Sequence, residues 1–336
     1  MTSAKHIHVK DLDDWANRLH AQPQRPLLIH LNADTTWLVQ IPYPSSAVPP
    51  SGRTHYNVLV DPWLQGPQSD VASWFSTQWH VVPPGVATIA ELNVILRDLE
   101  ARRADGDFAG DSLVDLVAIS HEFTDHCHRA TLEELPPTTP IFATDVAADL
   151  IRGWTHFDTV VTTPALGDGV DWTRLTVGSL PPWLAIGRVT TPGNALYYHS
   201  AVFIAFDLAG QGTAEAVIYS PHGIESEDLL ALSASGISAL ALLHGLHDVS
   251  IWMTKQLNLG ALNGLRAVRA CGAKYWIATH DEVKTGGGLI APFLRRVPYS
   301  VKEAVAHQEK QMRQQEGKAP EYEFVELGSG DGFLLD

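Results

Sequence analysis

The sequence predicts an α/β fold, an αββα sandwich in which two mixed β-sheets pack face to face with helices outside. The chain reads as two halves, and each half opens with β-rich runs and closes with strands interleaved with helices. No linker divides the halves, so a single domain is expected over residues 1–336, with a core at about 27–290 and a C-terminal helix and strand within 298–330. A hydrophobic fraction of 45% against 18% charged residues can fill a large core.

The first half is predicted mainly from short apolar runs. Leu113–Ile119 is apolar apart from Asp115, which is typical of a strand buried on both faces. Apolar residues near helical spacing predict a helix over 87–103. The other expected strands are 27–31, 35–41, 56–60, 141–143 and 158–162, and the other expected helices are 129–135 and 146–152.

The second half begins with β-rich runs and returns to alternating helix and strand. The expected strands are 174–177, 183–190, 200–207, 216–219, 240–243, 275–278 and 322–327. The expected helices are 259–271 and a long polar helix near 301–315.

Composition excludes several classes of partner. With 23 basic and 38 acidic residues the net charge is −15, so the surface repels phosphate backbones and anionic lipids, and neither a nucleic-acid nor a membrane partner is expected. No apolar window is long enough for a membrane span, and residues 1–10 lack the apolar run of a signal peptide. Cys127 and Cys271 show no metal-binding or disulfide spacing, which favours a reducing, cytoplasmic compartment. A small molecule is the expected partner.

The stretch His121–His128 (His-Glu-Phe-Thr-Asp-His-Cys-His) directly follows the predicted buried strand 113–119. Three imidazoles and two carboxylates within eight residues are typical ligands of Zn, Fe or Mn. The loop after a strand end is also where α/β folds place ligands. The alternative interpretation is a solvated polar loop in which histidines pair with neighbouring acids.

Ser-His-Glu-Phe-Thr-Asp-His (residues 120–126) resembles the His-x-His-x-Asp-His signature of the metallo-β-lactamase superfamily. Asp61, at the end of an early strand, is similar to the family's structural Asp that orients the metal loop, and His280 is similar to its late His. The resemblance covers roughly residues 27–290 and extends to the branch of phospholipase D-like and ascorbate-lactonase-like hydrolases. It implies the αββα fold and a metal-dependent hydrolase.

The sequence departs from the family pattern at three positions. Phe123 stands where the signature has its second His, and a phenyl ring cannot bind a metal. Asn194 stands where the middle His follows Pro-Gly, although His199 could replace it if the loop folds back. His222 stands where the family has a bridging Asp.

The resemblance nevertheless implies a complete ligand set for one metal position: Asp125, His126, His222 and His280. The other position keeps only His121, with His199 as a conditional ligand. We therefore expect one ion, Zn²⁺ with Fe or Mn as alternatives, and His121 as a fifth ligand or a base.

Residues near other strand ends are candidates for substrate contact. His244 and His247 follow an apolar strand, and Trp63 and Trp183 could line a pocket for an apolar substrate. A solvated loop explains the two histidines equally well, and core packing is the alternative for the tryptophans.

The expected activity is hydrolysis of a small-molecule ester, lactone, thioester or amide by a metal-activated water. Asp125 would accept a proton from that water or orient it, and His121 would assist. Two alternatives stay open. One is a non-hydrolytic metalloenzyme (iron-dependent redox, decarboxylation or isomerisation), and the other is a catalytically degenerate relative that only binds a ligand.

Overall fold

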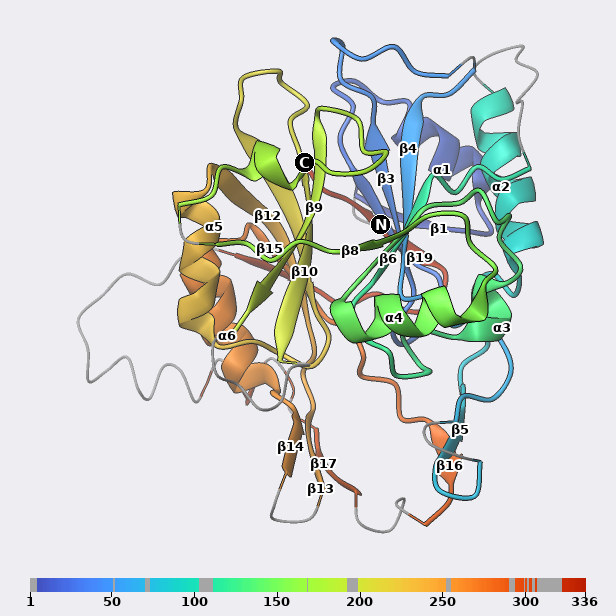
Figure 1. Ribbon diagram of the computed structural model, residues 1–336, viewed down its shortest axis with the longest axis vertical. Coiled ribbons are helices and arrows are strands. Elements are labelled where there is room, and N and C mark those ends of the chain that lie inside the picture. The colour runs from blue at the N-terminus through green and yellow to red at the C-terminus, as the bar shows by residue number, and fades with distance from the viewer. Residues whose placement is uncertain are drawn as a thin grey trace.

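The structure is a computed structural model that describes residues 5–50, 52–69, 73–102, 111–167, 169–191, 199–251, 255–289, 294–298, 300, 302–303, 306 and 322–336. Figure 1 shows two main β-sheets facing each other, with helices on the outer side of each. The predicted αββα fold class is confirmed. Among the described helices, none has the length and apolar character needed to cross a membrane.

The first sheet contains eight strands within the described residues, in the order β1-β19-β2-β3-β4-β6-β7-β8. Their bounds are β1 His6–His8, β2 Leu27–His30, β3 Trp37–Pro42, β4 His55–Val60, β6 Leu116–Ile119, β7 Ile141–Ala143, β8 Val160–Thr162 and β19 Asp331–Leu334. Because β4, β6, β7 and β8 are parallel neighbours, the loops that follow them leave one edge of the sheet.

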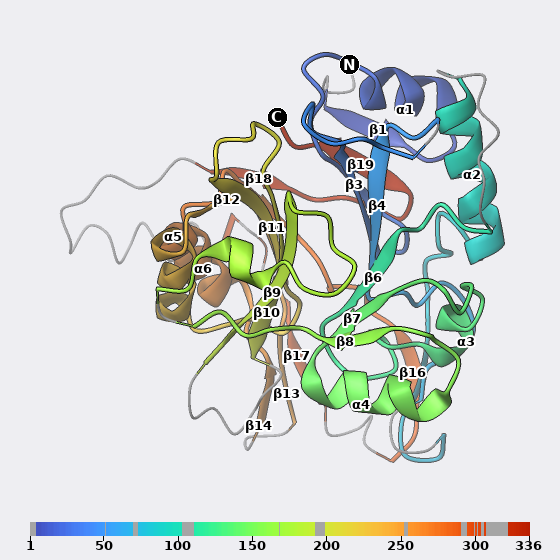
Figure 2. The same cartoon turned by 45° about the horizontal axis from the view of Figure 1, so that its top comes forward.

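The C-terminal strand β19 completes this sheet between β1 and β2, and Figure 2 shows it beside β1. It is antiparallel to both, and Phe333 lies opposite His6 on one side and Leu28 on the other. Strands β1 and β19 were not expected from the sequence, because His-Ile-His and Asp-Gly-Phe-Leu contain only one and two large apolar residues and form no apolar run.

The second sheet contains six strands within the described residues, in the order β18-β15-β12-β11-β10-β9. Their bounds are β9 Leu184–Thr190, β10 Ser200–Phe206, β11 Ala214–Ser220, β12 Ile237–His244, β15 Tyr275–Ile277 and β18 Glu323–Val325. Strands β11, β12, β15 and β18 are parallel, so Ser220, His244 and Ile277 end at the same edge.

Helices cover the outer face of each sheet (Figure 1). Those on the first sheet are α1 Leu12–Leu19, α2 Ile89–Ala101, α3 Arg129–Leu132 and α4 Asp145–Trp154, and those on the second are α5 Leu230–Ala234 and α6 Ala261–Cys271. In β2, three consecutive residues are apolar because both faces of the strand are buried. Leu27 and Ile29 pack on the helix side, whereas Leu28 packs between the sheets. A strand buried on both faces has no polar alternation.

Two small sheets extend beyond the main sheets on one side of the molecule (Figure 1). One pairs β5 (Thr77–Trp79) with β16 (Thr285–Gly287), and the other contains β14 (Lys255–Asn258), β13 (Asp248–Ile251) and β17 (Leu294–Val297). Strand β13 follows the end of β12, and β16 follows the loop after β15. Both therefore extend from the edge where the parallel strands of the second sheet end.

The predicted strand at 174–177 is wrong. The chain forms a 3-10 helix there, η1 (Trp172–Leu175), whose first turn is capped by the Asp171 carboxylate accepting from the Thr173 N–H at 2.9 Å. A second 3-10 helix, η2 (Ser226–Leu229), precedes α5. The predicted helix at 301–315 lies almost entirely outside the described residues, and the extent of the single domain stays a prediction.

Candidate metal centre

The candidate site lies where the parallel strands of both sheets end. Asp61 follows β4 and His121 follows β6, and these two strands are neighbours in the first sheet. His222 follows β11, and His280 follows β15 with two residues between. The topology thus brings the loops that carry these four residues to the facing edges of the two main sheets.

Asp61 holds the loop that carries His126. It is fully buried and adopts a left-handed backbone conformation (φ 43°), which turns its carboxylate toward the end of β6. One carboxylate oxygen accepts the Ser120 N–H at 2.7 Å, and the other lies 2.7 Å from Nδ1 of His126. This is the orienting contact that the resemblance implied for Asp61. Because a carboxylate accepts, Nδ1 of His126 donates, and its Nε2 keeps a lone pair.

His222 and His280 are held in the same way by other side chains. Nδ1 of His222 lies 2.8 Å from the amide oxygen of Asn258, at the end of β14. Nδ1 of His280 lies 3.1 Å from an oxygen of Asp34, in the turn between β2 and β3. In each histidine the donated Nδ1 proton leaves Nε2 as the electron-pair donor, an arrangement that usually accompanies metal-binding histidines.

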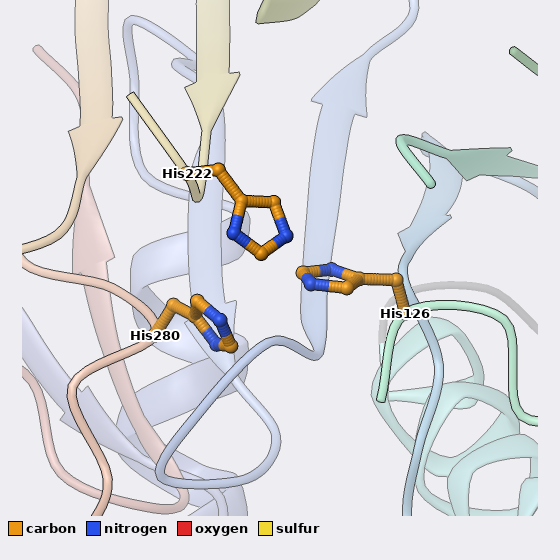
Figure 3. A group of neighbouring side chains, drawn as sticks. All are labelled: His126, His222 and His280. Carbon is orange, nitrogen blue, oxygen red and sulfur yellow. The ribbon is translucent and has the colours of Figure 1, made fainter. Parts of the chain in front are cut away.

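The three imidazoles His126, His222 and His280 meet at one point. One ligand atom from each lies within 4.8 Å of the others, and all three residues are buried. Their ring centroids are 4.9–5.1 Å apart, and Figure 3 shows the rings around one shared space. Burial, followed by the neighbouring histidines, holds the pKa of His222 well below its usual value, and burial also lowers the pKa of His280. Burial also opposes the charge on His126, but Asp125 and then Asp61 raise its pKa above the usual value. Three imidazoles converging in this way fit a Zn²⁺-type ion.

A second buried cluster, which the sequence analysis missed, adjoins the first. The ammonium of Lys284 lies 2.6 Å from an oxygen of Asp34 and 2.7 Å from Oδ2 of Asp125, and the same Asp125 oxygen is 4.0 Å from Nε2 of His280. Burial would raise the pKa of the Asp125 carboxyl, but Lys284 and then His126 hold it well below its ordinary value. Burial likewise opposes the charge on Lys284, yet the two carboxylates raise its pKa. The predicted ligand Asp125 is therefore shared with a lysine.

His121 lies beside the three imidazoles. Its ring centroid is 4.7 Å from that of His222 and 5.4 Å from that of His126. Phe123, the residue that interrupts the signature, lies 6.0 Å from His121 and 5.9 Å from His222 between ring centroids. Burial, then the charges that His222 and His126 would carry, holds the pKa of His121 well below its usual value, so this imidazole is neutral.

The structure does not bring His199 into either group of converging ligand atoms that the described residues form. Its Nε2 lies 3.1 Å from the carbonyl oxygen of Leu257, in β14. Asn194, the other candidate for the middle ligand position, lies outside the described residues.

The residues predicted to contact substrate lie in different places. His244 is buried, and both of its ring nitrogens are engaged, by the Asn263 side chain at 2.7 Å and the Gly245 carbonyl at 2.8 Å. His247 is less buried and contacts the Arg296 guanidinium at 3.1 Å. The contacts at both ring nitrogens indicate a structural role for His244. His247 is only partly buried.

The two tryptophans also differ in their distance from the candidate site. Trp63 is fully buried, stacks on His80 with centroids 3.7 Å apart, and has the Lys284 ammonium 5.3 Å from its ring centroid. Trp183 precedes β9, and the strand register puts this end of β9 level with the start of β11, away from the end that leads to His222. Trp183 instead packs edge-on against Tyr56, so it is remote from the three imidazoles.

Asp34, Asn258 and Lys284 are the site residues that sequence reasoning missed. Asp34 lies in a polar turn, Asn258 ends a four-residue strand, and Lys284 lies in a loop. The pattern around Lys284 offered one signal, a lone cation four residues after a predicted metal ligand. Nothing local distinguished the other two from ordinary turn residues.

No family model matches the sequence, and no curated protein is similar to it in sequence. Solved structures are similar. One described as a possible metal-dependent hydrolase from Veillonella parvula is 13% identical, with a TM-score of 0.53 over 93% of this chain and 100% of that chain. Isothiocyanate hydrolase from Delia radicum gut bacteria is 14% identical, with a TM-score of 0.55 over 92% and 100%. The metallo-β-lactamase fold protein YhfI from Bacillus subtilis is 13% identical, with a TM-score of 0.47 over 92% and 99%.

The first two likenesses extend over nearly the whole length of both chains, and at such identities they concern the fold. They agree with the four-layer architecture of two facing sheets and their outer helices. The chain therefore has the metallo-β-lactamase fold.

Proposed function

We propose that this protein is a metal-dependent hydrolase of a small-molecule ester, lactone, thioester or amide, with one metal ion held by His126, His222 and His280. The observation that carries the proposal is an arrangement common to these three imidazoles. Each has its Nδ1 held by a side-chain oxygen, and their remaining ligand atoms converge in a buried space. Zn²⁺ is the ion we propose, because nitrogen ligands from three imidazoles suit it.

A divalent ion in this position would supply Lewis-acid polarisation of a substrate oxygen and would acidify a nearby water. Two residues of the chain would handle the attacking water. His121, a neutral imidazole beside His222, would accept the proton that the attacking water loses. Asp125 stays ionised, since Lys284 holds its pKa low. It would orient the water by accepting a hydrogen bond.

The structural neighbours support the hydrolase class. The two with the higher TM-scores are described as hydrolases, one of them acting on isothiocyanates, which are small electrophilic molecules. An acidic chain also favours an uncharged small substrate over a polyanion. Cytoplasmic location remains part of the proposal, supported by the free thiols Cys127 and Cys271.

The test is a hydrolysis screen on metal-loaded protein with a model ester, lactone, thioester and anilide, each with and without chelator. We expect at least one substrate to be hydrolysed, the rate to fall to background with chelator, and Zn²⁺ to restore it. His222→Ala should lose both metal and activity, whereas His199→Ala should keep the metal. An inert screen on metal-loaded protein would contradict the proposal, and iron as the purified metal would then favour a non-hydrolytic metalloenzyme.

A further inference from the structure

Lys284 is a buried cation at the centre of the site. Its side chain is only 5% exposed, and its ammonium lies 2.6 Å from Asp34 and 2.7 Å from Asp125. A buried ammonium is stable only when carboxylates compensate its charge. Here two carboxylates do so, and the distances are those of charge-assisted hydrogen bonds.

The same two carboxylates form a group that could bind a metal. Asp34, Asp125 and His280 each offer one ligand atom, these atoms lie within 4.8 Å of one another, and all three residues are buried. Carboxylate oxygens with one imidazole are ligands that divalent transition metals accept. His280 also belongs to the three-imidazole group, so the two clusters share one member.

The surroundings keep the lysine where it is. Its ammonium lies 5.3 Å from the ring centroid of Trp63, a distance suited to a cation–π contact. Trp63 is itself stacked on His80, whose Nδ1 lies 2.6 Å from Glu282. Directly after Lys284 the chain enters β16, whose pairing with β5 anchors the backbone. Swinging the side chain out would break contacts with three different elements of the fold.

We propose that Lys284 occupies the place of a second metal ion, and that its ammonium limits the centre to the one ion held by His126, His222 and His280. The inference rests on the proposed metal-dependent function and adds the residue that sets the metal count. A second dication at Asp34 and Asp125 would have to displace the ammonium from both carboxylates. The displaced charge would then remain buried without a partner, or the loop before β16 would have to open.

The proposal explains why an acidic cluster beside three imidazoles needs no second ion. Asp34 bonds to His280 through one oxygen and to Lys284 through the other. Asp34 therefore couples the lysine to a metal-binding histidine. The lysine would permanently offset one of the two carboxylate charges and would not depend on metal supply.

The experiment is a count of metal ions per chain by elemental analysis, after dialysis against excess Zn²⁺ and removal of loosely bound ions. Wild type should hold one ion. Lys284→Met, which keeps an apolar stem of similar length and removes the charge, should hold two. Lys284→Arg, which keeps the charge, should hold one. Lys10→Met is the matched control at an exposed lysine and should also hold one.

A double variant assigns the second ion to its site. Asp34→Asn keeps an oxygen for Nδ1 of His280 but removes the carboxylate charge, so Lys284→Met combined with Asp34→Asn should return the count to one. Circular dichroism and thermal unfolding establish that each variant is folded. If Lys284→Met does not fold, Lys284→Gln replaces it with the same expectation.

The possible counts separate the two proposals. A folded Lys284→Met or Lys284→Gln protein with one ion overturns the role of Lys284 and leaves the three-imidazole centre intact. Two ions in wild type also overturn it, since the ammonium would then not exclude the second ion. No ion in wild type overturns the metal centre itself, and the inference with it.

Discussion

Asp34 and His280 are joined twice, across 246 positions of sequence: the His280 N–H donates to the Asp34 carbonyl at 2.8 Å, and Nδ1 of His280 lies 3.1 Å from the Asp34 carboxylate. His280 adopts a left-handed backbone conformation (φ 59°) at this point. The double contact fixes both the position and the ring orientation of a residue in the loop that follows β15 of the second sheet. It therefore ties the first sheet to the metal centre.

Asn258 orients the ring of His222 in a similar way, with its amide oxygen 2.8 Å from Nδ1. Asn258→Ala should weaken Zn²⁺ binding by about 10- to 100-fold, the usual cost of losing a partner that orients a metal ligand. Competition with a chromophoric chelator measures the dissociation constant. Asn17→Ala, at an exposed position of α1, should leave it unchanged. An unaltered affinity in Asn258→Ala would show that this contact does not orient a ligand.

Asp61 should matter for folding as well as for the metal. Asp61→Ala would leave the Ser120 N–H and Nδ1 of His126 buried without their acceptor. We expect a loss of about 3–5 kcal/mol in the free energy of unfolding, as when one partner of a buried charged pair is removed. Urea denaturation of metal-free protein measures it, with the exposed Asp111→Ala as control. A loss below about 1 kcal/mol would mean that water replaces the carboxylate at little cost.

Gly223, directly after His222, has φ +85°, and a Cβ there would lie 2.6 Å from Cβ of Leu259. Leu259 also donates its N–H to the His222 carbonyl at 2.9 Å, so the clash would displace the loop that carries the histidine. Gly223→Ala should cost about 1 kcal/mol for the backbone and about 1–3 kcal/mol more for the overpacking, and should weaken metal binding.

Gly210→Ala is the matched control for that substitution. Gly210 also has a positive φ (+67°), but a Cβ there would meet nothing within 4 Å. It should show the backbone cost alone, with unchanged metal affinity. Equal losses of stability in the two variants, measured by thermal unfolding, would argue against a clash at Leu259.

His247 should make stability depend on pH. Burial, and then the Arg296 guanidinium, lower the pKa of His247 from its usual 6.5 to about 4. The unfolded chain therefore takes up a proton first as the pH falls, so stability should decline from about pH 6.5 and level off below about pH 4, by up to about 3 kcal/mol. His247→Gln should flatten this decline in urea denaturation across that range. An identical decline in wild type and variant would refute the assignment.

Much of the fold could be predicted because its main strands are buried on both faces. Runs such as those of β6 and β15 remain apolar without interruption, and the order of the strands gives the layers. The error at η1 arose because Leu175 and Val177 alternate with the polar Arg174 and Thr176 as in a strand, whereas the Asp171 cap turns the backbone into a 3-10 helix.

The candidate site could be predicted in part for a related reason. His126, His222 and His280 follow recognisable strands. Their places after these strand ends therefore indicated that the three side chains lie close together. Their partners Asp34 and Asn258, and the cation Lys284, come from a turn, a short strand and a loop that only the tertiary structure brings together. Long-range pairings of this kind leave no periodicity in the sequence.

X-ray absorption spectroscopy of the zinc-loaded protein tests the three-histidine centre most directly, because it counts the atoms around the metal. We predict about three imidazole nitrogens at roughly 2.0–2.1 Å, with the outer-shell scattering of the rings and no metal neighbour. A first shell dominated by carboxylate oxygens, or a second metal at about 3.5–4 Å, would contradict the single ion held by His126, His222 and His280.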